Sequence, residues 1–425
     1  MAEVQYNLSQ QIPEFDSIIF ENERTDPTLL KVTHCVCKSL FDQTFNVIRY
    51  DKKSLTPDLI STYGLCRSII VNSSKKVVSF APPKSISYDI FSRMYPTEAP
   101  NLVAQEFVEG TMINVFWDDM SGYWEFATRS TVGASSTFYK KMTFRDMFLD
   151  AANVNNLCLD TLDKSHCYSF VLQHPENRIV VPFSDPQLYL IAVYSIDNTP
   201  DNIKVISNDI YEIKSMGLFD TTRVKFPERY EFTSYNDLVD KFGSLQTPYD
   251  CLGVVIYNKE TGERTKIRNP VYEQVRHLKG NQPKMHYQYL CLRREGKVSE
   301  FLKYYPENKY DFANYRNQLH SFTYALYQNY ISCYIRKERP LLEFSPQFRT
   351  HMFNIHQIYI TQLKEQKLHV TNAIVINYVN GVHPSLLMFC LNFHMRKKNT
   401  DMTWDQDTQW IDQNTIALEG WQQGA

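Results

Sequence analysis

Short apolar runs separated by turn-forming residues dominate about the first 275 positions of the chain. The clearest pairs of runs are 69–71 with 77–80 and 112–117 with 123–127, each joined by a short polar segment. This pattern predicts β-hairpins. Apolar residues at helical spacing after Thr143 predict an inserted helix. Short strands with inserted helices favour an α+β domain with an antiparallel or mixed sheet over a doubly wound parallel domain.

The hydrophobic period becomes helical from about residue 285. Apolar side chains recur every three or four positions at Phe312, Tyr315, Leu319, Phe322, Leu326 and Tyr330, and again at Met352, Ile355, Tyr359 and Leu363. Thr371 and Pro384 suit the starts of two further helices. We therefore expect a sheet domain over 1–280, an all-helical domain over 285–398 and a tail over 399–425.

The composition excludes intrinsic disorder and a strong overall electrostatic field. Aromatic residues make up 14% of the 425 positions, far more than in chains too polar to fold. The 45 Lys and Arg nearly balance the 47 Asp and Glu, so binding to nucleic acid would need a local patch. Nine scattered Cys argue for a reducing compartment. Without an apolar run of 18 residues or a secretory start, we expect a soluble, intracellular chain without membrane association.

The last 27 residues differ from the rest of the chain. Residues 399–425 contain five acids and no Lys or Arg, and they hold Trp404, Trp410 and Trp421, three of the five Trp. Exposed Trp in an acidic tail is costly unless another surface receives it. Two interpretations stay open: a strap packed on the protein's own surface, and a segment that docks on a protein partner or inhibits the chain itself.

Common catalytic and metal-binding patterns are missing from the sequence. His34, Cys35 and Cys37 have the types of metal ligands, but a structural zinc needs four, and no second pair of fitting spacing follows nearby. We expect these three residues to be buried on a strand instead, and we predict no metal site. Neither standard glycine-rich phosphate loop nor a serine nucleophile turn is present.

A basic stretch over 264–284 contains six Lys or Arg and one acid. Lys266 and Arg268 flank Ile267, so a strand would place both cations on one face and the apolar residue on the other. Two cations on one face suit a phosphate group, and Arg can contact it through two nitrogens. A solvated basic face is the alternative.

Six motifs occur in one order over roughly residues 60–290 and resemble those of a known family. They are Leu65-Cys66-Arg67-Ser68-Ile69, Phe107-Val108-Glu109-Gly110-Thr111-Met112, Ala127-Thr128-Arg129-Ser130-Thr131, Pro175-Glu176-Asn177-Arg178-Ile179-Val180, Leu252-Gly253-Val254-Val255 and Lys266-Ile267-Arg268-Asn269. In this order they resemble the motifs of covalent nucleotidyltransferases of the RNA ligase 1 type. More narrowly, the chain resembles divergent ligase-like proteins of large DNA viruses. The resemblance implies an ATP-grasp-like nucleotidyltransferase domain followed by helices.

The residue at the nucleophile position departs from the family. In that family a Lys that begins a Lys-x-Asp-Gly motif attacks the α-phosphate of ATP, and the adenylate then passes to an RNA 5′-phosphate. Aligning Glu109-Gly110 on Asp-Gly places Phe107 at the nucleophilic Lys, and Phe has no lone pair with which to attack. Two acids of the family are also replaced, by Leu252 and Val171. The resemblance therefore implies no catalytic residue.

The basic positions of the family persist. By resemblance the nucleotide- or phosphate-binding residues are Arg67, Lys84, Glu109, Gly110, Arg129, Lys266 and Arg268. Phe107 could stack a base beside these cations or pack in the core. The pattern indicates a site that binds phosphate without transferring it.

Three functions compete at this point. The first is a catalytically impaired, RNA-ligase-like viral protein that binds RNA or other nucleic-acid ends or nucleotides, in the host cytoplasm (the viral factory) or the virion. The second is an active ligase with a relocated nucleophile, for which Lys84 is the best candidate and which alone would require ATP and Mg²⁺. The third is a structural or virion-packaged interaction protein.

Overall fold

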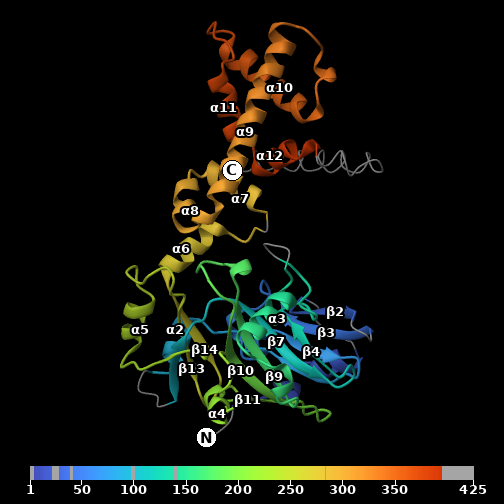
Figure 1. The fold of residues 1–425 in the computed structure, drawn as a ribbon, viewed down its shortest axis with the longest axis vertical. Coiled ribbons are helices and arrows are strands. Elements are labelled where there is room, and N and C mark those ends of the chain that lie inside the picture. The colour runs from blue at the N-terminus through green and yellow to red at the C-terminus, as the bar shows by residue number, and fades with distance from the viewer. Residues whose placement is uncertain are drawn as a thin grey trace. The chain divides into compact units, whose positions relative to one another are not determined.

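The computed structural model describes residues 4–21, 28–38, 42–96, 101–137, 142–282 and 284–394, apart from the side chains of Lys38 and Asp42. The acidic tail predicted over 399–425 lies outside these residues. The chain divides into two compact units, Met1–His277 and Leu278–Ala425. Figure 1 shows strands in the first unit and helices in the second.

The largest sheet of the first unit has six antiparallel strands. Their order is β1 (Val4–Asn7), β11 (Lys204–Asn208), β10 (Gln187–Asp197), β9 (His166–Gln173), β7 (Thr111–Asp118) and β8 (Tyr123–Ala127). β7 and β8 form one of the two predicted hairpins. The helix expected after Thr143 is α3 (Phe144–Val154), which Thr143 caps.

Two further antiparallel sheets have four strands each. One runs β2 (Leu30–Lys38), β3 (Asp42–Tyr50), β4 (Ile69–Asn72) and β5 (Val77–Phe80), and contains the other predicted hairpin. The second, called the β12–β14 sheet, runs β12 (Arg229–Tyr230), β6 (Leu102–Glu106), β13 (Gly253–Asn258) and β14 (Arg264–Arg268). The prediction of antiparallel sheets is confirmed.

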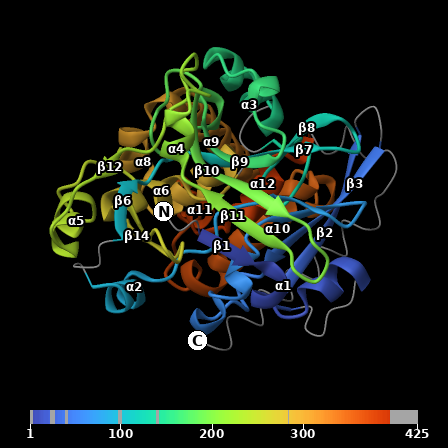
Figure 2. The same cartoon turned by 90° about the horizontal axis from the view of Figure 1, so that it is seen from below.

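Helices cover one face of the β12–β14 sheet. Figure 2 shows α2 (Tyr88–Met94) and α5 (Tyr235–Phe242) beside this sheet. Phe91 of α2 and Leu238 of α5 share a buried core with Val254, Ile256 and Ile267 of the sheet. Because alternate residues of a strand face opposite ways, Val255, Lys266 and their neighbours in register lie on the other face.

The other two sheets pack on each other. Phe45 and Phe80 of the β2–β5 sheet contact Phe116 and Tyr194 of the six-stranded sheet, with ring centroids 5.7 Å and 5.0 Å apart. Helix α3 and helix α4 (Ile210–Ser215) contribute to a separate core on the six-stranded sheet. A further short α-helix of this unit is α1 (Leu8–Gln11).

All secondary-structure elements in the described part of the second unit are helices. The predicted α+β class with a helical C-terminal region is therefore confirmed. The helices of the second unit are α7 (Met285–Arg294), α8 (Val298–Tyr304), α9 (Lys309–Tyr330), α10 (Pro346–Ile358), α11 (Asn372–Gly381) and α12 (Pro384–Leu391), while α6 (Pro270–Lys279) contains the division between the units. Thr371 and Pro384 stand at the predicted helix starts. Among the described helices, none alone has the length and apolar character to cross a membrane, although α11 and α12 meet that test as a bent pair.

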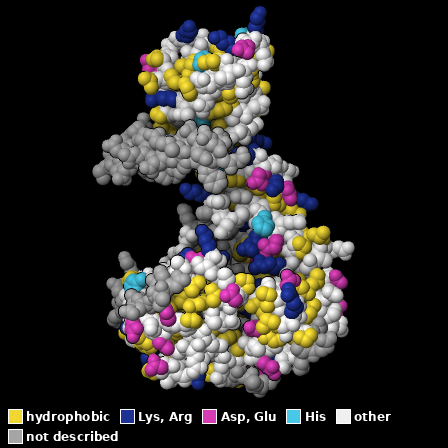
Figure 3. All heavy atoms as spheres, turned by 180° about the vertical axis from the view of Figure 1, so that it is seen from behind, with side chains coloured by type: hydrophobic (Ala, Val, Ile, Leu, Met, Phe, Trp, Pro, Cys, Tyr) yellow, Lys and Arg dark blue, Asp and Glu magenta, His cyan; other side chains and the backbone are white. Residues whose placement is uncertain are grey.

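The residues first considered as metal ligands lie on strand β2. Cys37 is buried, but His34 is exposed and its Nδ1 lies 3.1 Å from Oδ1 of Asn46. The expectation that all three are buried is therefore wrong for His34, which occupies the solvent-facing side of its strand, and for Cys35, which is half-buried. On the face shown in Figure 3, acidic, basic and apolar side chains are interspersed over the first unit.

Candidate phosphate-binding site

Three cations project from one face of strand β14. Arg264, Lys266 and Arg268 alternate with Thr265 and Ile267, which are buried on the opposite face. In the register of the sheet, Val255 of β13 lies opposite Lys266. The prediction that Lys266 and Arg268 share a strand face, with Ile267 behind them, is confirmed.

Lys266 is the most strongly perturbed of these cations. Burial, together with the positive charges of Arg264, Arg67, Arg268 and Lys84, lowers the pKa of its amino group to about 6. The charged neighbours with the largest effects on Lys266 are thus cations. A buried amine among cations holds its proton weakly unless an anion enters.

Two loops bring further predicted cations to this place. Burial lowers the pKa of Arg67 to about 10, with Arg264 and Arg129 as its nearby cations. Burial also lowers the pKa of Lys84, together with Arg67 and Arg268. Nζ of Lys84 donates a hydrogen bond to the carbonyl oxygen of Ser85 at 3.0 Å. The structure therefore brings Arg67, Lys84, Lys266 and Arg268 together.

Arg129 joins the same group. Its guanidinium carbon lies 4.8 Å from the ring centroid of Tyr50, and its charge lowers the pKa values of Arg67 and Lys52. Nε of Arg129 is buried and has no hydrogen-bond partner among the described residues. A buried donor of this kind is rare in proteins and suits an anionic ligand.

Two members of the group were missing from the predicted site. Arg264 is the first residue of β14, and its side chain reaches the loop before Lys84, where Nε donates to the carbonyl oxygen of Pro83 at 3.1 Å and Nη2 to that of Pro82 at 3.0 Å. Lys52 follows strand β3, and burial, Arg129 and Arg67 lower its pKa. The term cation cluster denotes Lys52, Arg67, Lys84, Arg129, Arg264, Lys266 and Arg268.

Only Arg268 in the cation cluster has a carboxylate partner among the described ion pairs. Its Nη1 lies 2.5 Å from Oε1 of Glu273, which also pairs with Arg276 at 3.5 Å. Arg268 is exposed, so this pair is partly screened by solvent. The other members of the cation cluster have no carboxylate partner among the described ion pairs. Theirs are therefore the charges that a bound anion would neutralise.

Phe107 lies within the cation cluster. It follows strand β6, and its amide donates to the carbonyl oxygen of Gly253 at 3.3 Å. Nζ of Lys266 lies 4.2 Å from the ring centroid of Phe107, and the guanidinium carbon of Arg268 lies 5.6 Å from it. The ring is half-buried, so Phe107 contacts cations and is not a fully buried core residue.

Glu109 and Gly110 have structural contacts. The Glu109 carboxylate is buried and accepts hydrogen bonds from the amides of Val180 at 2.8 Å and Val181 at 3.1 Å. Gly110 has φ +148°, and a Cβ there would lie 2.5 Å from the carbonyl oxygen of Leu172. The chain's own backbone therefore engages Glu109, and Gly110 is required by close packing.

The positions of the two replaced acids are buried and apolar. Val171 lies between Met112 and Tyr189 in the six-stranded sheet, and Leu252 directly precedes β13. Among the described residues there is no group of three His, Cys, Asp or Glu that could hold a metal ion. The cations present thus suit phosphate groups.

Comparisons with known proteins agree with the motifs. No protein-family model matches the chain. The RNA ligase of Rhodothermus phage RM378 is 24% identical over 378 residues, which cover 77% of this chain and 80% of the phage protein. The chain is similar to RNA ligases. The resemblance predicted from the six motifs is thereby confirmed.

A second relative of this RNA-ligase-like chain is also viral. The immediate-early protein ICP-46 homolog of Invertebrate iridescent virus 6 is 25% identical over 254 residues, which cover 55% of this chain and 53% of that protein. This match spans about half the length of the relative. Both relatives come from viruses, as the narrower resemblance implied.

Solved structures similar to the RNA-ligase-like chain include two RNA ligases. A Naegleria gruberi RNA ligase, solved with ATP and Mn, has a TM-score of 0.35 and 11% identity over 46% of this chain and 58% of its own. An archaeal ATP-dependent RNA ligase has a TM-score of 0.36 and 9% identity over 89% of this chain and 79% of its own.

Proposed function

We propose that this RNA-ligase-like chain binds the phosphate groups of nucleic-acid ends or nucleotides in the cation cluster and does not transfer them. The observation that carries the proposal is Lys266, a half-buried amine whose pKa is most strongly affected by four neighbouring cations, Arg264, Arg67, Arg268 and Lys84. Like charges gathered in this way repel one another, and a phosphate group relieves that repulsion. Charge-assisted hydrogen bonds from Lys and Arg to phosphate are also the stronger ones.

The absence of transfer follows from the residue beside Lys266. Phe107 has no atom that could attack a phosphorus, so the lysyl-adenylate of an RNA ligase cannot form at that position. Leu252 and Val171 offer no oxygen to a metal or a ribose. In-line attack tolerates little displacement, which argues against a substitute from another lysine.

The direct test is a search for a covalent adduct. The purified protein is incubated with α-labelled ATP or GTP and Mg²⁺ or Mn²⁺, and then analysed by denaturing gel and intact mass. We expect no adduct. In parallel, binding is measured for one RNA oligonucleotide with a 5′-phosphate and with a 5′-hydroxyl, and we expect tighter, salt-sensitive binding of the phosphorylated form.

Each other outcome supports a different function. An adduct that peptide mapping places on Lys84 or Lys266 would indicate an active nucleotidyltransferase with a relocated nucleophile. Absence of both adduct and phosphate-dependent binding would favour a structural or virion-packaged interaction protein. Because both relatives are viral, the proposal extends to action in the host cytoplasm or the virion. A protein partner for the acidic tail stays a prediction.

A further inference from the structure

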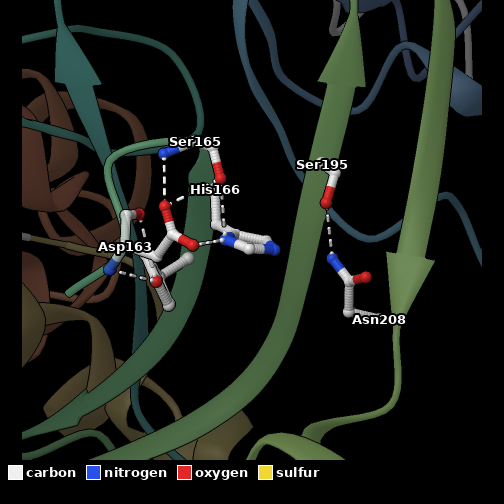
Figure 4. Close-up of polar contacts among 6 residues, drawn as sticks. Asp163, Ser165, His166, Ser195 and Asn208 are labelled. Carbon is white, nitrogen blue, oxygen red and sulfur yellow. Dashed lines mark hydrogen bonds and ion pairs between the residues drawn. The ribbon is translucent and has the colours of Figure 1, made fainter. Parts of the chain in front are cut away.

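Polar side chains around a cavity of the first unit bond one another. The cavity has a volume of about 470 Å³, and its lining includes Asp163, His166 and Asn208. Figure 4 shows Oδ2 of Asp163 beside Nδ1 of His166, 3.3 Å away, and Nδ2 of Asn208 donating to Oγ of Ser195 at 2.9 Å. These groups serve contacts within the first unit, whereas the second unit exposes apolar side chains at one of its ends.

That end of the second unit is formed by the C-terminal ends of α9 and α10. Each helix is continued by a π-helical turn, Ile331–Ile335 after α9 and Tyr359–Leu363 after α10. The ring of His356 lies between the two turns, with its centroid 3.9 Å from that of Tyr334 and 5.8 Å from that of Tyr359. The turns therefore lie side by side and form one surface. Such turns are rare and are frequent at functional sites.

This surface combines exposed apolar side chains with cations. Ile335 is 60% exposed, Ile360 43% and Leu368 50%. The exposed charged residues beside them are five cations and two acids: Arg336, Lys337, Arg339, Lys364 and Lys367, with Glu338 and Glu365. The term tip surface denotes residues 331–339 and 359–368. Apolar side chains that gather on a surface mark an interaction site, and the excess of cations favours an acidic occupant.

The acidic tail has the matching composition. Residues 399–425 contain five acids and no Lys or Arg, and they hold Trp404, Trp410 and Trp421. Residues 278–394 of the same unit contain 14 Lys or Arg and only seven Asp or Glu. Trp is enriched among the side chains that anchor one segment on another surface. The tail therefore complements the tip surface in both charge and apolar character.

The tail also begins within reach of the tip surface. His394 lies beside the first turn of α10, where its Nε2 is 3.3 Å from Nε2 of Gln347. Tyr359 follows Gln347 by 12 positions, which correspond to about 18 Å along a helix. Trp404 follows His394 by ten positions, and ten extended residues span up to about 33 Å. The first Trp of the tail can thus reach the tip surface while every helix stays intact.

We propose that residues 399–425 dock on the tip surface of the same chain. Indole rings of the tail cover Ile335 and Ile360, and its carboxylates pair with Lys337 and Lys364. Because tail and surface belong to one chain, their effective concentration is about millimolar, so a modest intrinsic affinity is sufficient. A protein partner of the tail would have to displace it from this surface. The proposal is independent of phosphate binding in the first unit.

Tryptophan fluorescence of the full chain tests the proposal. Three of the five Trp lie in the tail, and Trp117 and Trp124 of the first unit add a constant background. The test variant combines Ile335→Glu with Ile360→Glu, both at exposed positions. Tyr310→Glu is the matched control, because Tyr310 is 76% exposed and lies in the first turn of α9, at the other end of that helix.

We expect the test variant to raise the acrylamide quenching constant of the tail fluorescence about twofold or more, because indole rings leave an apolar surface for water. Its emission should also move to longer wavelength. Lys337→Glu combined with Lys364→Glu should have the same effect through charge, and high salt should move the wild type in the same direction. Tyr310→Glu should behave like the wild type. If the Ile variant fails to fold, the Lys variant provides the comparison.

Three results would overturn the proposal. Equal quenching in the wild type and in both double variants would mean that the tail does not dock on the tip surface. An equal rise in quenching for Tyr310→Glu would mean that the tail covers the second unit without preference for the tip surface. Quenching of the wild type that rises on dilution would assign the tail to the tip surface of a second copy of the chain.

Discussion

Nζ of Lys266 lies over the ring of Phe107, 4.2 Å from its centroid. The aromatic face favours the protonated amine, while the ring also excludes water from it. An additional lysine in place of Phe107 would add one more positive charge to a group whose members already lower one another's pKa values. Phe107 thus removes the expected nucleophile and lessens the repulsion in the cation cluster at the same time.

Restoring the lysine is therefore expected to cost stability without restoring ligation. Phe107→Lys should lower the melting temperature in buffers free of polyanions, because it adds a cation to the cluster. Tripolyphosphate should raise the melting temperature of Phe107→Lys by more than it raises that of the wild type. Thermal melts with and without tripolyphosphate measure both effects. An AMP adduct on the introduced lysine would contradict the expectation, because it would show that the pocket lacks nothing but the nucleophile.

Removing single cations should weaken phosphate binding unequally. Lys266→Ala is expected to cost about 1.5–3 kcal/mol of binding free energy for a 5′-phosphorylated RNA, as for other hydrogen bonds to charged groups. Arg268→Ala should cost less, since Arg268 is exposed and paired with Glu273. Each change should also flatten the dependence of affinity on salt.

Fluorescence anisotropy over a salt series measures these effects. Lys76→Ala provides a control, because Lys76 is exposed in the β4–β5 turn and does not belong to the cation cluster. Wild-type affinity in both Lys266→Ala and Arg268→Ala would remove the cation cluster from the proposed function.

The lowered pKa of Lys266 predicts a pH dependence of stability. Between about pH 6 and the ordinary lysine pKa of 10.5, the folded protein lacks a proton that the unfolded chain binds. Stability therefore rises with pH in this window, by at most about 1.4 kcal/mol per unit, and is independent of this group below pH 6. Lys266→Met removes the amino group and with it this pH dependence. The variant should be more stable than the wild type at pH 7.

Urea denaturation at several pH values between 6.5 and 9 tests this sign. The advantage of Lys266→Met should shrink as the pH rises, because the wild type gains stability and the variant lacks that gain. If the difference in unfolding free energy between the variant and the wild type stays constant across this pH range, Lys266 keeps its proton in the free protein.

Glu109 should matter for stability more than for binding. Glu109→Ala leaves the buried amides of Val180 and Val181 without this acceptor and is expected to cost about 1–3 kcal/mol of unfolding free energy. Glu109→Gln keeps an acceptor oxygen and should cost less. Chemical denaturation measures both, and RNA affinity of the folded variants serves as the second readout. A large loss of affinity with unchanged stability would instead assign Glu109 to the ligand.

Local pattern predicted the elements of the fold better than it predicted the site. The hairpins, the Thr143 cap and the helical periodicity of α9 are encoded within a few consecutive residues, and each is present. The strand alternation of Lys266 and Arg268 was equally readable. Lys52 carried no such signal, because it joins the cation cluster only through tertiary folding, which brings it close enough for the charges of Arg129 and Arg67 to lower its pKa. The engagement of Glu109 by backbone amides 71 and 72 positions away was likewise invisible in the sequence.

The hydrogen bonds from Arg264 to Pro82 and Pro83 span 182 and 181 positions of the chain. During synthesis, the loop that carries Lys84 must therefore wait for strand β14 to leave the ribosome before these bonds can form. Until then, Arg67, Lys84 and Arg129 lack the partners from β14 that complete the cluster. A nascent chain stopped before residue 264 would consequently lack β14 and with it Arg264, Lys266 and Arg268 of the cation cluster.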